Sequence, residues 1–110
     1  MPAYKPGDVV VVPFPFTERL ASKRRPALVC SSDSYNGATR HLVLAMITTS
    51  AHAKWPGDVA IRDLGATGLP APSTVRWKLF TLDASLVLRR AGVLSVHDRE
   101  ACAAQHPIAL

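Results

Sequence analysis

The chain has 110 residues, of which 48% are hydrophobic, 19% charged and 6% aromatic. The 13 Lys and Arg residues outnumber the 8 Asp and Glu residues and give a formal net charge of +5. The apolar fraction is too high for a disordered chain, and 6 Gly and 2 Cys exclude the collagen-like and disulfide-rich classes. The length fits one domain over residues 1–110.

The apolar runs are short, and this bears on the location of the protein. The longest, such as residues 9–12 and 42–47, have the length of strands and not of membrane spans. Residues 1–6 carry no apolar signal-peptide region. We therefore expect a cytoplasmic protein without a membrane segment, whose Cys30 and Cys102 are both reduced.

The chain begins with a strand and a loop. Gly7 and Asp8 form a turn signal, and the β-branched residues 9–12 predict a strand. Pro13 follows directly and removes a backbone donor, so this half of the strand must be an edge, a bulge or a barrel corner. Residues 17–24 are polar and basic and predict a surface loop.

Two further strands complete the first half of the chain. Residues 25–31 predict a strand that opens with Pro26. Residues 32–37 have the composition of a turn, in which Asn36-Gly37 can take a positive φ. Residues 41–47 are almost continuously apolar and predict a central strand buried on both faces.

The second half of the chain predicts further strands and one helix. Residues 57–61 and 75–80 are typical of strands, and residues 65–72 of a loop. Residues 83–88 fit either a short helical turn or a final strand. Ser95 is a candidate N-cap for a helix that continues to residue 105 and that Pro107 ends.

The order of these segments indicates the fold class. Five or six short strands with one late helix predict a mostly β protein with a C-terminal helix, built as a small, strongly bent sheet or barrel. No long helices separate the strands, and this excludes a doubly wound α/β fold.

The residue inventory offers little support for metal or nucleophile chemistry. The 2 Cys and 4 His have no metal-ligand spacing, and the carboxylates are single apart from Asp98 and Glu100. The chain contains neither a glycine-rich phosphate loop nor a Gly-x-Ser-x-Gly motif. We expect no metal and no cofactor.

Basic residues gather where the first loop meets the second strand, namely Arg19, Lys23, Arg24 and Arg25. A solvated loop charge is the simpler interpretation of Arg19 and Lys23. Arg25 differs, because Pro26 restricts its backbone to extended geometry and its guanidinium leaves a rigid element. It can offer two parallel N–H donors to a phosphate, and the alternative is a structural salt bridge with Asp8 or Glu18.

Three other residues, Thr48, Arg76 and Lys78, are candidates for contact with an anionic partner. Thr48 ends the most apolar strand, where a hydroxyl more simply caps a turn. The period of two over residues 75–80 places Arg76 and Lys78 on one face, where they contact an anionic backbone or are solvated. Trp77 lies on the other face and is more simply a core residue than a base-stacking one. These residues alone predict a basic β-rich domain with a weak preference for nucleic acid.

Three blocks of sequence follow one another in a specific order: residues 7–17 (GDVVVVPFPFT), residues 22–29 (SKRRPALV) followed by 31–36 (SSDSYN), and residues 45–50 (AMITTS) supported by 73–83 (STVRWKLFTLD). Together they resemble the MazF/PemK family of toxin endoribonucleases from bacterial type II toxin–antitoxin systems. The resemblance implies an SH3-like small barrel, a homodimer and a cognate antitoxin partner, commonly acidic. It also implies metal-independent cleavage of single-stranded RNA, in which the substrate's own 2′-hydroxyl attacks phosphorus and leaves 2′,3′-cyclic phosphate and 5′-hydroxyl ends.

The same resemblance assigns roles to single residues. The family's arginine corresponds to Arg25, which would hold the phosphate and neutralise developing charge, and its threonine to Thr48, which would bind a non-bridging oxygen. Candidate RNA-binding residues are Arg24, Lys78, Arg76 and Lys23, and the loop over residues 17–23 is expected to border the site. Pro107 ends the terminal helix earlier than in relatives, and this bears on dimerisation.

One alternative function stays open from the residues alone. The chain could be a non-catalytic, basic SH3-like module that binds nucleic acid or a protein partner, as its charge of +5 permits.

Overall fold

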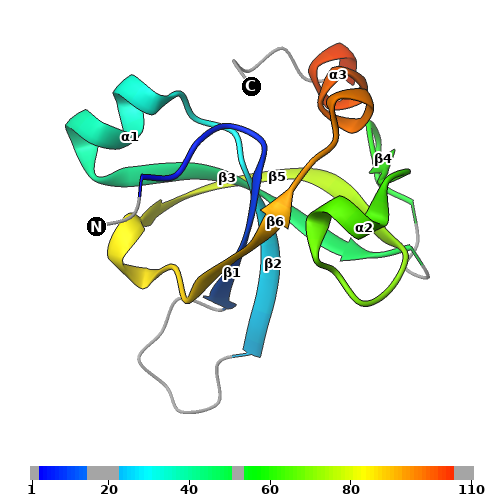
Figure 1. Cartoon of the computed structure of the whole chain (residues 1–110), viewed down its shortest axis with the longest axis horizontal. Helices are drawn as coiled ribbons and strands as arrows, with labels where there is room; N and C mark the ends of the chain where they lie inside the picture. Colours follow the sequence, from blue (N-terminus) through cyan, green and yellow to red (C-terminus); the bar gives the residue numbers. More distant parts are fainter. Residues whose placement is uncertain (1–2, 15–22, 51–53, 106–110) are drawn as a thin grey trace.

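The computed structural model describes residues 3–14, 23–50 and 54–105. In these parts of the chain, one antiparallel six-stranded sheet runs in the order β4-β5-β3-β2-β1-β6. The strands are β1 (Asp8–Phe14), β2 (Lys23–Val29), β3 (His41–Thr49), β4 (Val59–Ala60), β5 (Ser73–Asp83) and β6 (Arg89–Val93). The sheet curls into a half-barrel and α3 (Val96–Gln105) lies beside β4 (Figure 1). The predicted mostly β architecture with a C-terminal helix is confirmed.

Both faces of the sheet are buried at its centre. In β3, Leu42 and Leu44 belong to one hydrophobic cluster, while Ala45 and Ile47 belong to the other. The first cluster contains Tyr4, Val10, Val12, Ala27, Val29, Leu42, Leu44, Leu82 and Ala84. The second contains Val9, Leu28, Cys30, Ala45, Ile47, Val59, Val75, Leu94 and Cys102. Successive strand residues point to opposite faces, so a nearly continuous apolar run serves both clusters, as predicted for residues 41–47.

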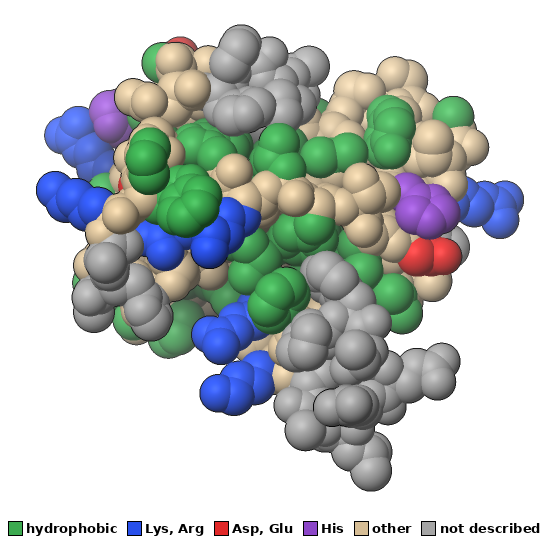
Figure 2. Space-filling view, turned by 180° about the vertical axis from the view of Figure 1, so that it is seen from behind, with side chains coloured by type: hydrophobic (Ala, Val, Ile, Leu, Met, Phe, Trp, Pro, Cys, Tyr) green, Lys and Arg blue, Asp and Glu red, His purple; other side chains and the backbone are tan. Residues whose placement is uncertain are grey.

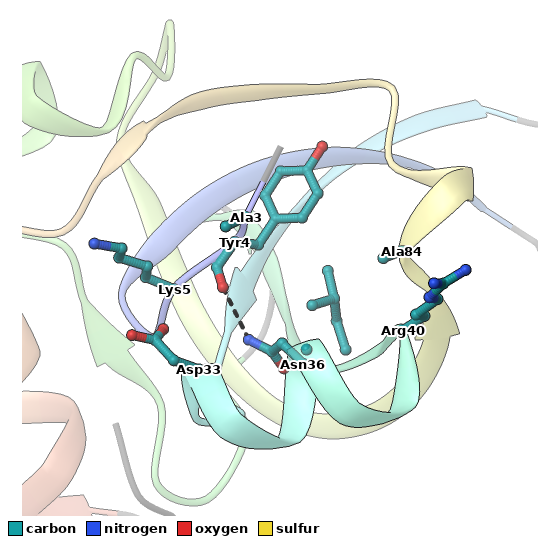
Figure 3. Close-up of a pocket in the computed structure, with 9 residues that line it drawn as sticks. Ala3, Tyr4, Lys5, Asp33, Asn36, Arg40 and Ala84 are labelled. Atoms are coloured by element: carbon teal, nitrogen blue, oxygen red, sulfur yellow. Dashed lines mark hydrogen bonds between the residues drawn. The ribbon is translucent and has the colours of Figure 1, made fainter. Parts of the chain in front are cut away.

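A helix, α1 (Asp33–Thr39), replaces the turn predicted at residues 32–37. Ser32 caps it, because its hydroxyl accepts a hydrogen bond from the backbone N–H of Tyr35 at 3.2 Å. Asn36 is buried, and its Nδ2 donates to the carbonyl oxygen of Tyr4 at 3.0 Å, the contact dashed in Figure 3. The positive φ falls on Arg40, at 55°, and not on Gly37. The prediction was wrong because the Asn36–Tyr4 bond joins residues 32 positions apart in the chain, which the local sequence does not show.

Other boundaries also differ from the sequence prediction, since β4 is shorter than the predicted strand at 57–61 and β5 is longer than that at 75–80. β2 begins at Lys23, because Lys23 and Arg24 pair with the end of β1 and so leave the predicted loop. A four-residue helix, α2 (Leu64–Thr67), occupies part of the predicted loop at 65–72. The ambiguous segment contains a short 3₁₀ helix, η1 (Ala84–Leu86), and β6, which was not predicted, follows it and pairs with β1.

The C-terminal helix begins where the sequence predicts. The backbone N–H of Asp98 donates to Ser95 Oγ at 3.2 Å, which confirms Ser95 as its cap. The buried Asp98 carboxylate accepts the backbone N–H groups of Arg62 and Asp63 at 3.0 and 2.9 Å, so α3 is tied to the segment that leads into α2. Pro107 lies outside the described residues. Among the described helices, none is long and apolar enough to cross a membrane.

Both cysteines are free and fully buried in the second cluster. Burial raises the pKa of the Cys30 thiol to about 12 and that of the Cys102 thiol to about 11. Each thiol is therefore a packed core group.

Candidate active site

β2 and β3 pair over only three residues and then separate. The last pair is Ala27 with Met46. Beyond it, β2 stays paired with β1 as far as Lys23, while β3 stays paired with β5 as far as Thr49. The two central strands therefore part at one end of the sheet.

Pro26 explains where the pairing stops. The backbone N–H of Cys30 donates to the carbonyl of Val43 in β3 at 2.8 Å. Every second residue of an antiparallel strand bonds to the same neighbour, so the nitrogens of residues 28 and 26 also face β3. Proline has no N–H to donate. The ladder thus lacks its donor at Pro26, the first position beyond the last pair.

A cleft of about 320 Å³ lies where the strands part, and we call it the β2–β3 cleft. Its lining includes three consecutive residues from each strand, Arg24, Arg25 and Pro26 from β2 and Ile47, Thr48 and Thr49 from β3. Consecutive strand residues alternate between the two faces. The cleft therefore lies between the strand ends, and both faces of the sheet contribute to it.

Arg25 and Thr48, which are distant in sequence, both line this cleft. The register that pairs Ala27 with Met46, continued by two residues, sets Arg25 opposite Thr48. Arg25 is exposed and Thr48 half-buried. The structure thus brings together the two residues predicted to be catalytic.

The guanidinium of Arg25 forms no salt bridge within the described part of the chain. Asp8, one of its two predicted structural partners, instead lies 3.8 Å from Nε of Arg90 and accepts the backbone N–H of Lys5. Glu18, the other, lies outside the described residues. Arg24 and Lys23 are exposed on the same strand, and Arg24 lines the cleft. The predicted loop at 17–23 is described only at Lys23.

Arg76 and Lys78 lie outside the lining of the β2–β3 cleft. Arg76 forms a two-point ion pair with Asp58, with Nε–Oδ1 and Nη2–Oδ2 distances of 3.2 and 2.9 Å. This hydrogen bonding lowers the pKa of the Asp58 carboxyl below its usual value. Nζ of Lys78 lies 4.5 Å from the centroid of the Trp55 ring. Both side chains therefore make contacts within the protein at the β4–β5 edge.

Trp77 behaves as the core interpretation predicts. Its ring packs against the second hydrophobic cluster. Its Nε1–H donates to the carbonyl oxygen of Gly57 at 2.7 Å, so the polar end of the indole is satisfied within the protein.

A second cavity, of about 480 Å³, lies between the N-terminal segment, α1 and η1. Leu42 and Ala84 are part of its lining, and Lys5 and Arg40 stand at opposite sides (Figure 3). Its buried amide, on Asn36, is already bonded to Tyr4. This cavity is roomier than the β2–β3 cleft, and its lining also includes the charged side chains of Lys5, Asp33 and Arg40. Across residues 3–14, 23–50 and 54–105, no three His, Cys, Asp or Glu side chains come together as metal ligands.

The lining of the β2–β3 cleft is basic, with Arg24 and Arg25 among its residues. Figure 2 shows Lys and Arg side chains at the left and toward the lower end of one face. The lower end is where β2 begins (Figure 1). A cleft in such surroundings suits an anionic ligand.

The model of the PemK-like, MazF-like toxin family of type II toxin–antitoxin systems matches residues 5–106. The chain belongs to this family. The matched region contains all three blocks of the sequence resemblance and every described strand.

Solved MazF structures have the same fold. A mycobacterial endoribonuclease in complex with its cognate antitoxin is 18% identical, with a TM-score of 0.72 over 98% of this chain and 99% of that one. The Mycobacterium tuberculosis toxin MazF-mt6 is 20% identical, with a TM-score of 0.71 over 89% and 90%. A MazE-MazF structure from Deinococcus radiodurans is 23% identical, with a TM-score of 0.72 over 94% and 92%. No curated protein matches the chain in sequence.

The cleft of this MazF-like chain also contains residues that the sequence analysis missed. Arg89 of β6, Val11 and Ser73 line it together with residues 68–71. Arg89 and Arg90 are adjacent, and predicting a strand at 89–93 would have placed them beside β1. We did not predict this strand, because its sequence is polar and contains a glycine.

Proposed function

We propose that this MazF/PemK-family toxin is a metal-independent endoribonuclease that cleaves single-stranded RNA in the β2–β3 cleft. The observation that carries the proposal is that Arg25 and Thr48 line one cleft. Further support comes from the family match and from a mycobacterial structure of the same fold, which is an endoribonuclease.

The chemistry needs a site that stabilises charge. The 2′-oxygen of the substrate forms a bond to the adjacent phosphorus and loses its proton, while the bond from phosphorus to the 5′-oxygen breaks and that oxygen gains a proton. The products are a 2′,3′-cyclic phosphate and a 5′-hydroxyl. Negative charge grows on the non-bridging oxygens in between, and donors already in place there stabilise it.

In this proposal, Arg25 and Thr48 are those donors. Arg25 is exposed, and no described carboxylate competes for its guanidinium, so two of its N–H groups are available to the phosphate. A guanidinium stays protonated in proteins, so Arg25 supplies a fixed charge and not a general base. The hydroxyl of Thr48 donates to a non-bridging oxygen from the facing strand end.

The other Lys and Arg side chains that were predicted to bind RNA differ in their surroundings. We assign Arg24, in the cleft, and Lys23, exposed at the start of β2, to the RNA backbone. Lys78 is exposed on β5 and would contact RNA only beyond the cleft. We assign Arg76 to stability, because Asp58 already neutralises it.

The proposal includes protein partners. The mycobacterial relative is bound to its cognate antitoxin, and the Deinococcus relative is a MazE-MazF structure. For this chain we infer a homodimer and an antitoxin whose acidic character complements the net charge of +5. We place the toxin in the cytoplasm, where its RNA substrate is.

The test is cleavage of a mixed single-stranded RNA pool in EDTA. The native protein is expected to leave 5′-hydroxyl ends, which a polynucleotide kinase labels without prior phosphatase treatment. Arg25→Ala is expected to cleave about 10²–10³-fold more slowly. Arg62→Ala removes an exposed arginine outside the cleft and is the matched control.

Two results would contradict this proposal. Strict dependence on Mg²⁺ would exclude the mechanism. Salt-sensitive RNA binding without cleavage by the native protein would favour the alternative, a non-catalytic basic module.

A further inference from the structure

Arg89 lies across β1 from the proposed catalytic strand. Val11 of β1 pairs with Pro26 of β2 on one side and with Arg89 of β6 on the other. Residues paired across antiparallel strands share a face, so Arg89, Val11 and Pro26 form one row. All three line the β2–β3 cleft.

Arg25 belongs to the opposite face. It pairs with Val12, which belongs to the first hydrophobic cluster, so Arg25 lies on the face of that cluster. Val11 and Pro26 lie two residues from Val9 and Leu28, which belong to the second cluster, so they lie on the other face. β2 and β6 are also two strand spacings apart, about 10 Å. Arg25 and Arg89 therefore approach the cleft from different sides, and they suit two different phosphates of one RNA strand.

The charge of Arg89 is available to a ligand. Arg89 is exposed and forms no salt bridge among the described residues. Its neighbour Arg90 lies 3.8 Å from the carboxylate of Asp8 and is outside the cleft lining. The two adjacent arginines thus have different surroundings, and only Arg89 faces the cleft.

Residues 68–71 form the wall of the cleft beside Arg89, and this wall begins next to β6, the strand that carries Arg89. A Cβ added to Gly68 would lie 2.2 Å from the carbonyl oxygen of Ala91, and one added to Gly92 would lie 2.3 Å from that of Ala66. The backbones that follow α2 and form β6 are therefore in direct contact. The segment at residues 68–71 thus begins directly against the strand that carries Arg89.

This wall offers apolar surface next to the cation. Leu69, Pro70 and Ala71 line it, and Leu69 also packs against the second hydrophobic cluster. Ser73 Oγ donates to the carbonyl oxygen of Ala71 at 2.8 Å and holds the segment to β5. An apolar wall beside an unpaired arginine suits a nucleotide, whose base or ribose packs while its phosphate is bound.

We propose that Arg89 and residues 68–71 form a subsite for a nucleotide next to the scissile phosphodiester. Arg89 binds a phosphate other than the one at Arg25, and the apolar wall packs against the attached base or ribose. This inference rests on the proposed function. It assigns Arg89 to binding and positioning of the RNA strand, separately from the chemical step.

The test measures binding without cleavage. The probe is a short, random-sequence RNA with 2′-O-methyl groups throughout, which removes the attacking hydroxyl, and fluorescence anisotropy gives its affinity at several salt concentrations. Arg89→Gln is expected to weaken binding about tenfold. The slope of log K against log salt should become shallower by about 0.7, the value for one single-strand phosphate contact.

Two variants separate this role from a structural one. Arg90→Gln changes the neighbouring arginine outside the cleft and is expected to bind RNA as the native protein does. Arg89→Lys keeps the charge and is expected to keep the native salt slope. With a cleavable RNA, Arg89→Gln should chiefly raise KM, while Arg25→Ala should lower kcat.

The outcomes distinguish the subsite from the proposed reaction. If Arg89→Gln binds with native affinity and slope, the subsite is excluded, and cleavage by the native protein still decides the endoribonuclease proposal. If Arg89→Gln loses binding but the native protein never cleaves RNA, the subsite stands and the catalytic proposal falls. If the native protein binds no RNA, both are excluded.

Discussion

Pro26 shapes the candidate site because it has no backbone N–H. It removes the donor that would continue the β2–β3 ladder, and its ring restricts the backbone of Arg25 to extended geometry. A single residue thus opens the cleft and directs the arginine beside it.

Pro26→Ala is therefore expected to narrow the cleft. The restored N–H can bond to β3, a gain of about 0.5–1.5 kcal/mol, while the freer unfolded chain costs about 0.4–1 kcal/mol. The two effects nearly cancel, so stability should change little while RNA cleavage falls. Hydrogen exchange at residue 26 would show the new bond, and an unprotected amide there would contradict this account. Pro56→Ala, in the exposed turn that the Asp58 N–H closes on the Trp55 carbonyl, is the control.

Thr48 is expected to act through its hydroxyl alone. Thr48→Val keeps the β-branched shape that suits a strand end and should slow single-turnover RNA cleavage about 10²-fold, as loss of one donor to a developing oxyanion does. Thr48→Ser keeps the hydroxyl and should retain most activity. Equal rates for the valine and serine variants would show that the Thr48 hydroxyl takes no part in cleavage.

At the scale of elements, the contact between α2 and β6 determines the shape of the cleft wall. Gly92→Ala is expected to destabilise the protein by about 1–3 kcal/mol, because the new methyl group meets the backbone of residues 66 and 67, which cannot rotate away. Urea unfolding measures this loss, and RNA affinity should fall with it because residues 68–71 shift.

Gly37→Ala is the matched control for that change, and its effect should have the opposite sign. Gly37 lies in α1 with nothing within 4 Å of an added Cβ. Alanine there should stabilise the protein by about 0.5–1 kcal/mol through helix propensity. Destabilisation at both positions would mean that the clash at Gly92 is not the cause.

The elements that were predicted correctly are those whose signal is local. The β-branched residues 9–12 and the apolar residues 41–47 carry enough burial to determine a strand by themselves. α1 was missed because its residues are weak helix formers, and the helix depends on the bond from Asn36 to Tyr4, 32 residues away. β6 was missed because Gly92 and the two arginines interrupt its apolar pattern.

The same distinction applies to the candidate site. The position of Arg25 before Pro26 and that of Thr48 at a strand end are visible in the sequence, although only the family resemblance joined them. Arg89 could not be predicted, because its place in the cleft depends on β6 pairing with β1. The ion pair between Arg76 and Asp58 was likewise invisible, since it joins β5 to the turn before β4.

At the scale of the whole molecule, the two functions of charge are spatially separate. Arg24, Arg25 and Arg89 surround the cleft without described carboxylate partners. Arg76 is paired at the β4–β5 edge, and Arg90 lies beside Asp8. The arginines available to an anionic ligand therefore lie at one end of the central strands, apart from the ion pair at the β4–β5 edge.

The paired charges should appear in the acid stability of the protein. Hydrogen bonding from Arg76 lowers the pKa of Asp58, and bonds from Ser85 lower that of Asp83. A carboxyl whose pKa is lower in the folded state stabilises the fold above its unfolded pKa, about 4, and this contribution is lost as the pH falls through the folded value. Stability should therefore decline below about pH 4.

Asp58→Asn tests how much of this loss of stability at low pH comes from the ion pair between Arg76 and Asp58. The variant should be less stable than the native protein at pH 7, and the difference should shrink as the pH falls below about 4, because the native pair is then lost as well. Urea unfolding across this range measures the effect. Arg76→Gln should show the same convergence while keeping the native salt dependence of RNA binding, because Arg76 is engaged by Asp58 outside the cleft. A shallower salt slope in Arg76→Gln would instead place this arginine on the RNA.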